Sequence, residues 1–419
     1  TGKDKIPANK PIVFAPNHQN ALNDPMAVLL NTRYQPVWLA RADIFGKYKA
    51  IDIILRFMKI IPVYRLRDGR ENLEKNTETF SASIKVLENN SALALFPEAA
   101  HTFRNQMMPH KKAVPRIVFM AEEQSGNKLD IQIIPTGIYY SHFWKYNRTL
   151  IVNFGAPIRV NDYMEAYRRN PNAAIMALKT KIHDAILPLI INIKSKQFYE
   201  DFERIREMYG RHFLTRQNKK FSPVNLFNSD QLLVCQLDKM EAKNYALTEQ
   251  LVGEANNLYK QIRSLGLRTW LIYENEIHAW KTAINIFLLL TRLPLFIFGF
   301  LVNAVPFFVI DRFVRFKIKD KSFWSSFFLV GGIIIFPLFY IILFLSFSWM
   351  IPLFWQKIAF VISLPFSGKL AFKWYIFFRK TVGTYRLLRL KWHKPGKFND
   401  LIETKNRLFN QLDTVLPSN

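Results

Sequence analysis

Residues 12–25 of this chain read IVFAPNHQNALNDP and hold both a predicted strand and the first candidate catalytic group. The apolar run Ile12–Ala15 is short and uninterrupted, which predicts a buried β-strand. His18 follows at the end of that strand, and Asp24 comes a few residues later. A carboxylate that holds one imidazole nitrogen leaves the other nitrogen free to take a proton, so the pair predicts a general base.

The same segment has a second interpretation that needs no chemistry. A histidine at a strand end can simply bond to the backbone. Asp24 precedes Pro25 and the apolar residues Met26–Leu30, which is typical of a helix N-cap followed by proline at the first helical position. The two interpretations are compatible, because one carboxylate oxygen can cap the helix while the other faces His18.

Short apolar stretches alternate with longer helical patterns over residues 1–190. This alternation predicts an α/β domain over residues 1–194, with a mixed sheet flanked by helices. We expect strands at Ile12–Ala15, Val37–Ala40, Ile61–Tyr64, Leu93–Phe96, Ile131–Thr136 and Leu150–Phe154, and helices at Asn72–Glu88, Val114–Glu123 and Ala173–Ile186.

Three further stretches follow the His18 segment in order. Residues 61–65 read IPVYR, residues 96–102 read FPEAAHT, and residues 133–137 read IIPTG. Together with the His18 segment they resemble the four sequence blocks of the glycerolipid acyltransferase family, the membrane enzymes that esterify glycerol phosphate or lysophosphatidic acid. The resemblance covers roughly residues 5–190 and implies an acyltransferase-type α/β domain.

The resemblance implies a membrane-bound O-acyltransferase of phospholipid biosynthesis. His18, assisted by Asp24, would deprotonate a glycerol hydroxyl, which attacks a fatty acyl thioester and releases CoA or acyl carrier protein. The expected acceptor is 1-acylglycerol 3-phosphate, which would give phosphatidic acid, and glycerol 3-phosphate comes next. Arg65 would bind the acceptor phosphate, with Arg67 as the alternative, and Glu98 would position the acceptor. No P-loop or Gly-x-Ser-x-Gly motif is visible, which favours direct transfer without an acyl-enzyme.

The spacing of the first block departs from the commonest family pattern. That pattern has four residues between histidine and aspartate, which would make Asn23 the acid. Here five residues separate His18 from Asp24, a gap that is known in some branches of the family, including fungal-type glycerol-3-phosphate acyltransferases. We assign Asp24 as the acid, and the residues between it and His18 must then form a turn.

The block at residues 96–102 also differs from the family's usual Phe-Pro-Glu-Gly-Thr-Arg-Ser. Ala99 stands at the glycine position, and alanine disfavours positive φ, so the backbone is constrained there. His101 stands at the arginine position. Without that arginine, we expect phosphate binding to shift to Arg104, Lys111 or Lys112.

The composition of the 419-residue chain favours a membrane partner over nucleic acid. The formal net charge of +26 fits either an anionic membrane surface or nucleic acid. The 37 phenylalanines are concentrated near the C-terminus among leucine and isoleucine, and no nucleic-acid-binding motif stands out. The single Cys235 excludes an internal disulfide and a cysteine metal site, and we expect no metal and no cofactor. Because Thr1 lies almost directly before the first strand, we expect a preceding N-terminal segment.

Residues 195–282 are rich in charged residues and poor in strand patterns, which predicts a helical insert or arm. Lys239–Ser264 predicts one amphipathic helix with an apolar face. That face consists of Tyr245, Leu247, Leu251, Ala255, Leu258 and Ile262. The segment is either a helical insert packed on the enzyme domain or a helical arm at the membrane surface.

Residues 283–378 are membrane-like. Ser325–Ile351 is apolar, uncharged and long enough to cross ~30 Å of hydrocarbon, and we expect a second span at Ile358–Phe378. Ile284–Ile310 is predicted to form a re-entrant hairpin that is broken near Pro294–Gly299. The connector 311–322 and the tail 379–419 are basic, which places both in the cytoplasm. We expect the catalytic domain on the same side, and Ile284–Ile310 then cannot cross the membrane once, which is the reason for the hairpin.

Two rival functions fit the same residues. The departures at Ala99 and His101 are compatible with acylation of another lysolipid or of an aminolipid. A non-catalytic membrane scaffold with a degenerate acyltransferase domain is the alternative that is not an enzyme.

Overall fold

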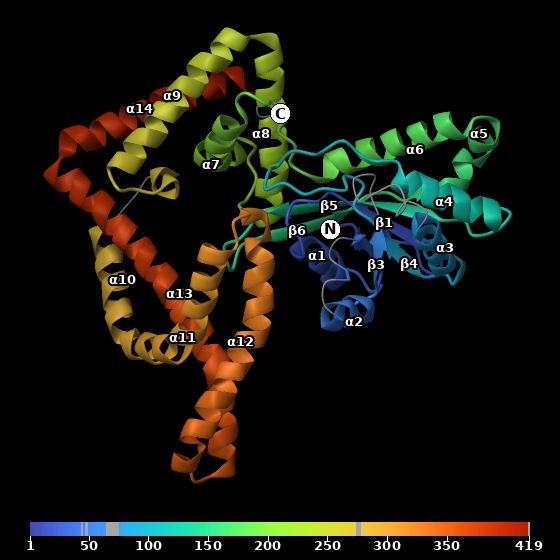
Figure 1. The fold of residues 1–419 in the computed structure, drawn as a ribbon. Helices are drawn as coiled ribbons and strands as arrows, with labels where there is room; N and C mark the ends of the chain where they lie inside the picture. The colour runs from blue at the N-terminus through green and yellow to red at the C-terminus, as the bar shows by residue number, and fades with distance from the viewer. Residues whose placement is uncertain (43–44, 47–48, 64–74, 274–277, 418–419) are drawn as a thin grey trace. The chain divides into compact units, whose positions relative to one another are not determined.

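The computed structural model describes residues 1–42, 45–46, 49–63, 75–273 and 278–417 (Figure 1). The chain divides into two compact units, Thr1–Asn192 and Ile193–Asn419. The first unit contains a sheet with helices on both faces, and the described part of the second unit is helical.

The sheet of the first unit is mixed. Its strands are β1 (Ile12–Pro16), β2 (Val37–Arg41), β3 (Ile60–Val63), β4 (Ala92–Ala94), β5 (Gln132–Tyr140), β6 (Leu150–Phe154) and β7 (Ile158–Arg159). They are arranged in the order β3-β2-β4-β1-β5-β6, and β7 also pairs with β5. The pairs among β1 to β5 are parallel, whereas β6 and β7 run antiparallel to β5. The predicted α/β fold with a mixed sheet is confirmed.

Helices cover the sheet on both faces because successive residues of a strand point to opposite sides. Val13 of β1 lies in a core that includes Ile84 and Ile117, whereas Phe14 lies in a second core with Val28. The helices of this unit are α1 (Asn23–Asn31), α2 (Lys49–Phe57), α3 (Lys75–Glu88), α4 (Ala113–Gln124), α5 (Met164–Arg169) and α6 (Pro171–Ile186), with short 3-10 turns at Lys3–Lys5, Val160–Tyr163 and Leu187–Leu189.

One predicted strand is too short. The sequence pattern ends it at Thr136, but β5 continues through Gly137 to Tyr140. A Cβ on Gly137 would lie 2.2 Å from the carbonyl oxygen of Leu189, so glycine at this position allows another segment to approach the strand closely.

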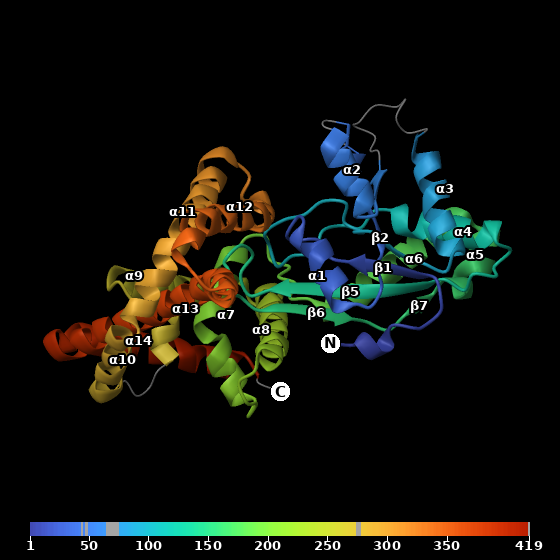
Figure 2. The same ribbon diagram turned by 90° about the horizontal axis from the view of Figure 1, so that it is seen from below.

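The second unit is built from long helices. These are α7 (Tyr199–Arg216), α8 (Pro223–Lys243), α9 (Tyr245–Ser264), α10 (Ala279–Thr291), α11 (Leu293–Lys317), α12 (Trp324–Phe347), α13 (Phe354–His393) and α14 (Pro395–Val415), with 3-10 turns η7 (Thr269–Tyr273), η8 (Lys321–Phe323) and η9 (Ser348–Met350). α11 and α12 lie side by side in both views (Figure 1, Figure 2).

The prediction of a single helix over Lys239–Ser264 is wrong. The helix breaks at Asn244, whose side chain accepts the backbone N–H of Leu247 at 3.0 Å and caps α9. The expected apolar face is buried at Leu251 and Leu258, whereas Tyr245 is exposed. α9 contacts α7, α8 and α14, so this face forms part of the core of the helical unit.

Two described helices are long and apolar enough to cross a membrane, Leu293–Lys317 and Trp324–Met350. The second coincides with the span expected at Ser325–Ile351. The first runs unbroken through Pro294–Gly299, so the break expected there is misplaced, and it lies instead at Arg292, between α10 and α11. The stretch expected as the other span, Ile358–Phe378, is not one of these two helices; it contains two lysines and lies within the 40-residue helix α13, which continues past residue 378.

Small and polar residues join α11, α12 and α13. A Cβ on Gly299 would lie 2.3 Å from the carbonyl oxygen of Ser367, so glycine allows the backbones of α11 and α13 to approach closely. The Asn303 amide donates to the Gly299 carbonyl at 2.8 Å and accepts the Tyr340 hydroxyl of α12 at 2.6 Å. These contacts fix the three helices against one another.

Candidate active site

The carboxyl ends of β1 and β4 bring the two most informative sequence blocks together. The strands are parallel neighbours, with Phe14 opposite Ala94. Carboxyl ends of parallel strands meet at one edge of a sheet, so the residues that follow β1 lie beside those that follow β4. The backbone N–H of His18 donates to Glu98 Oε1 at 3.0 Å, which joins the two loops directly.

The His18 ring is held by Asp24. Its Nδ1 lies 2.8 Å from Asp24 Oδ2. The same oxygen accepts the backbone N–H groups of Gln19 at 2.6 Å and Asn20 at 2.7 Å, and Oδ1 accepts the Tyr140 hydroxyl at 2.8 Å. Asp24 is 0 % exposed, so its carboxylate is fixed in position by these donors.

This arrangement sets the roles of the two imidazole nitrogens. An ionised carboxylate only accepts hydrogen bonds, so Nδ1 of His18 carries the proton that points at Asp24. Nε2 then keeps its lone pair and can accept a proton from a bound alcohol. Histidine and aspartate together have the geometry of a general base with an orienting carboxylate.

The expected N-cap at Asp24 is wrong. Helix α1 already begins at Asn23, its N-cap position is Leu22, and no side chain bonds there. The Asp24 carboxylate instead turns back toward the N–H groups that precede the helix. Ala21, at φ 35°, lies in the tight turn that the five-residue gap requires.

Aromatic side chains surround the His18 ring. The ring stacks on Phe96, with centroids 3.8 Å apart and planes 11° apart, and Phe96 stacks in turn on Trp38. His101, which replaces the family's arginine, has its ring centroid 4.9 Å from that of His18. This stacking and the hydrogen bond to Asp24 together restrict rotation of the His18 ring.

Glu98 lies under the loops rather than on the surface. It is 2 % exposed, and its second oxygen, Oε2, accepts the Met108 N–H at 3.0 Å. Burial raises the pKa of Glu98 to about 8; the N–H groups of Met108 and His18 lower it, and the Asp24 charge raises it. In this structure Glu98 therefore positions the backbone of His18, and its expected contact with the acceptor stays a prediction.

Glu98→Gln should flatten the pH dependence of stability between pH 4.5 and about 8. A carboxyl whose pKa is raised in the folded state contributes stability that is present at low pH and is lost as the pH rises through the folded pKa. We expect the unfolding midpoint of the wild type, measured in detergent across this window, to fall with pH more steeply than that of the variant. Parallel curves would show that Glu98 titrates normally in the folded chain.

The altered block has a left-handed backbone at Ala99. Ala99 has φ 56°, in the left-handed region that costs an alanine roughly 1–2 kcal/mol. The expected backbone constraint at Ala99 is thus confirmed, because alanine has a positive φ there.

The basic candidates lie on or near the same loops. The carbonyl of Arg104 accepts the Gln19 side-chain N–H at 3.0 Å, and the Lys111 N–H donates to the Pro97 carbonyl at 2.7 Å. Arg104, Lys111 and Lys112 are all exposed, and Lys112 precedes α4. The backbones of Arg104 and Lys111 thus lie next to the candidate base. Arg65 and Arg67 fall outside the described residues.

Tyr140 is the site residue that sequence reasoning missed. It donates to Asp24 from the end of β5, and burial, followed by the Asp24 charge, raises its pKa well above the ordinary value, which keeps the hydroxyl protonated. Asn17, also overlooked, bonds to both the N–H and the carbonyl of Ile138 and ties the loop after β1 to β5. The sequence signal that could have indicated Tyr140 is its place at the polar end of β5, which is otherwise apolar.

Tyr140→Phe should lower kcat by roughly ten- to a hundredfold and leave KM nearly unchanged, because a hydrogen bond to a buried charge is worth about 1.5–3 kcal/mol and the Tyr140 hydroxyl bonds to Asp24. Steady-state transfer rates give the comparison, with Tyr139→Phe, the preceding residue of β5, as a control. A change confined to KM would contradict a role in positioning Asp24.

No three histidine, cysteine, aspartate or glutamate side chains of the described residues are grouped as a metal site requires.

Comparisons with known proteins identify the class of domain. Residues 1–139, about a third of the chain, match the family model named Acyltransferase. The first unit thus carries an acyltransferase domain, and the resemblance of the sequence blocks is confirmed.

Two curated relatives from Saccharomyces cerevisiae are similar to this region. Glycerol-3-phosphate O-acyltransferase 2 is 24 % identical over 135 residues, which is 32 % of this chain and 18 % of the relative. Glycerol-3-phosphate O-acyltransferase 1 is 23 % identical over 204 residues, 43 % of this chain and 27 % of the relative. The chain thus spans less than a third of the length of each.

The crystal structure of the 1-acyl-sn-glycerophosphate acyltransferase PlsC from Thermotoga maritima is similar at 16 % identity and a TM-score of 0.30. The similarity covers 44 % of this chain and 70 % of that one.

Proposed function

We propose that the chain is a membrane-bound O-acyltransferase that transfers a fatty acyl group from a thioester to a phosphate-bearing glycerol acceptor. The observation that carries this proposal is the buried Asp24 carboxylate 2.8 Å from His18 Nδ1, at the strand edge where the Glu98 loop also begins. The acyltransferase family match over the same residues supports it.

The reaction needs one base and balances without a cofactor. His18 Nε2 takes the hydroxyl proton while the acceptor oxygen attacks the thioester carbonyl. The new C–O bond forms, the C–S bond then breaks, and the proton passes from His18 to the departing thiolate of CoA or acyl carrier protein. Asp24 stabilises the imidazolium that exists between these steps.

We propose 1-acylglycerol 3-phosphate as the acceptor, with glycerol 3-phosphate next. Arg65 would hold the phosphate, because a guanidinium makes paired charge-assisted bonds to it, and Arg104, Lys111 and Lys112 would contribute. The names of the yeast relatives favour glycerol 3-phosphate, and the departures at Ala99 and His101 are compatible with a different lysolipid or an aminolipid. Product analysis separates these cases: each acceptor is offered with labelled acyl-CoA and with labelled acyl carrier protein. If no combination of donor and acceptor gives a product, the non-catalytic scaffold is favoured.

We propose that the catalytic domain lies on the cytoplasmic face of the membrane and that the basic connector between α11 and α12 lies on the same side. Ser322→Cys, made in a Cys235→Ser chain, should then resist a membrane-impermeant thiol reagent added outside intact cells and react after permeabilisation. Labelling from outside would show that α11 crosses the membrane and that no re-entrant hairpin precedes the connector.

A further inference from the structure

Arginines converge on a hollow of about 410 Å³ inside the helical unit. The hollow lies where the end of α9 and the start of η7 meet the second half of α13. It is lined by Arg263, Gly266, Leu267, Arg268, Phe378, Arg379, Val382, Gly383 and Arg386. Four of the lining residues are thus arginines, and no acidic residue is among its described lining residues.

Three of the four arginines bond to neutral groups. Arg386 donates to the Gly266 carbonyl at 3.2 Å, and Arg379 donates to the Tyr375 hydroxyl at 2.8 Å. Arg263 likewise donates to the Tyr259 hydroxyl at 2.7 Å. Like charges around one hollow repel one another, and an anion bound there would reduce that repulsion. Glu274 and Glu276, which follow η7 in sequence, lie outside the described residues.

The lining also has an apolar side. Leu267, Phe378 and Val382 are also among the lining residues, together with Gly266 and Gly383. Gly266, at φ 67°, holds a backbone that a larger residue would strain, and a Cβ there would lie 3.6 Å from the Arg386 guanidinium. A ligand with a phosphate and an apolar stem matches this lining, because guanidinium forks pair with phosphate oxygens.

The place of the hollow along α13 points to the membrane surface. The more apolar first half of α13, which still contains Lys369 and Lys373, ends at Phe378, and basic residues become frequent from Arg379 onward. Trp374, one turn earlier, donates to the Leu289 carbonyl at 3.0 Å and stacks on both Phe296 and Phe378. Tryptophan followed by arginine is typical of the boundary between hydrocarbon and water.

We propose that this hollow binds the phosphate group of an anionic membrane phospholipid, separately from the acyl-transfer site. Such a lipid would hold the helical unit at the surface of an anionic membrane. The proposal does not depend on the acyl-transfer reaction.

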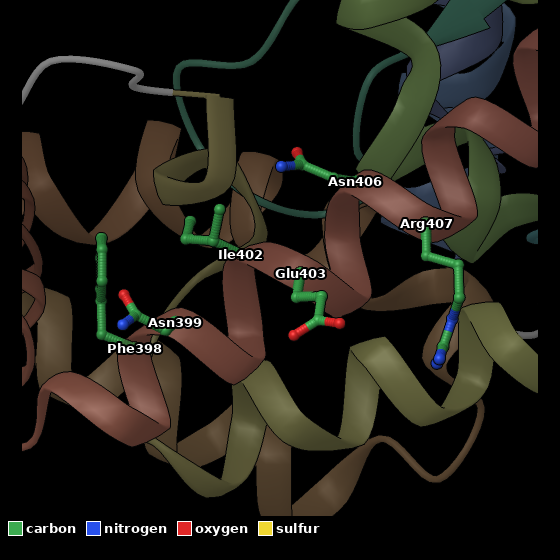
Figure 3. Close-up of a pocket in the computed structure, with 6 residues that line it drawn as sticks. All are labelled: Phe398, Asn399, Ile402, Glu403, Asn406 and Arg407. Atoms are coloured by element: carbon green, nitrogen blue, oxygen red, sulfur yellow. The ribbon is translucent and has the colours of Figure 1, made fainter.

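A second hollow, of about 440 Å³, differs from the first in the charge of its lining (Figure 3). All its lining residues belong to α14: Phe398, Asn399, Ile402, Glu403, Asn406 and Arg407. One arginine there is balanced by one glutamate in the lining, so the hollow has no excess positive charge.

Native mass spectrometry of the full chain in neutral detergent tests the proposal. We would titrate phosphatidylglycerol, phosphatidylcholine with the same acyl chains, and inorganic phosphate. Phosphatidylglycerol is anionic, whereas the choline cation of phosphatidylcholine would face the arginines. The test variant is Arg268→Gln/Arg379→Gln, and the control is Lys380→Gln/Arg389→Gln, which removes the same charge from exposed residues of α13 outside the hollow.

We expect the wild type and the control to bind phosphatidylglycerol at least tenfold more tightly than phosphatidylcholine, and the test variant to lose at least tenfold in affinity for phosphatidylglycerol. Unfolding midpoints verify that each variant is folded. If the double variant does not fold, the single variant Arg268→Gln, which changes an exposed residue, replaces it in the test. Equal retention by all variants, or equal binding of both lipids, would overturn the proposal. If inorganic phosphate displaces phosphatidylglycerol and its binding is lost in the same test variant, the proposal of a lipid ligand would be overturned and the hollow would be assigned to free phosphate.

Discussion

His18→Ala should lower the rate of acyl transfer by at least about a thousandfold, within the 10²–10⁴-fold range that a general base contributes. The reason is geometric: Asp24 binds Nδ1, so Nε2 is the nitrogen left to take the hydroxyl proton. Alanine also removes the ring that stacks on Phe96, so the variant needs a check of folding by circular dichroism and unfolding midpoint.

His183→Ala is the matched control for this prediction. His183 also bonds through Nδ1 to an aspartate, Asp184, at 3.1 Å, but it belongs to α6 and does not contact the His18 loop in any bond described above. We expect the control to keep the transfer rate of the wild type within about twofold. A comparable loss in both variants would mean that the effect of His18→Ala comes from folding.

Asp24→Asn should lower kcat by about 10²–10⁴-fold, which is the second-largest effect. The amide has the size of the carboxylate and can still accept from the Gln19 and Asn20 N–H groups with one oxygen. It lacks the negative charge that stabilises the imidazolium, and its NH₂ group would face the Tyr140 hydroxyl or the ring. Transfer rates under saturating donor and acceptor give the comparison.

The effects of the two substitutions on the transfer rate should not be additive. If Asp24 acts only through His18, the double variant His18→Ala/Asp24→Asn should be no slower than His18→Ala alone. A double variant that is slower by the product of both effects would assign Asp24 an independent role in the reaction.

The sequence pattern placed the first strand and the blocks at His18 and Glu98, because apolar runs and polar loop residues are local signals. The parallel pairing of β1 with β4 accounts for their meeting; the α/β alternation favours a parallel sheet, but the strand order comes from the structure.

Tyr140 could not be predicted in the same way. Gly137 indicated the end of a strand, but in the structure the glycine makes room for the chain at Leu189, a contact between residues far apart in sequence. The strand therefore continues to Tyr140, which reaches Asp24 across 116 residues of sequence.

The errors in helix boundaries have a similar origin. The hydrophobic pattern predicts one continuous amphipathic helix through Asn244, but an asparagine side chain can cap a new helix as well as occupy a surface position. Asp24 has the sequence signature of an N-cap, but its Oδ2 instead bonds to three groups that precede helix α1, in His18, Gln19 and Asn20. Local rules thus failed at the residue that the proposed chemistry uses.

The measurement that tests the central claim most directly is acyl transfer by the purified chain in detergent. Labelled acyl-CoA or acyl carrier protein would be offered with glycerol 3-phosphate or 1-acylglycerol 3-phosphate, and the wild type, His18→Ala and His183→Ala would be compared in parallel. We predict an acylated glycerol phosphate from the wild type and the control, and a loss of at least about a thousandfold with His18→Ala. Undiminished product from a folded His18→Ala chain would contradict the claim that His18 is the base.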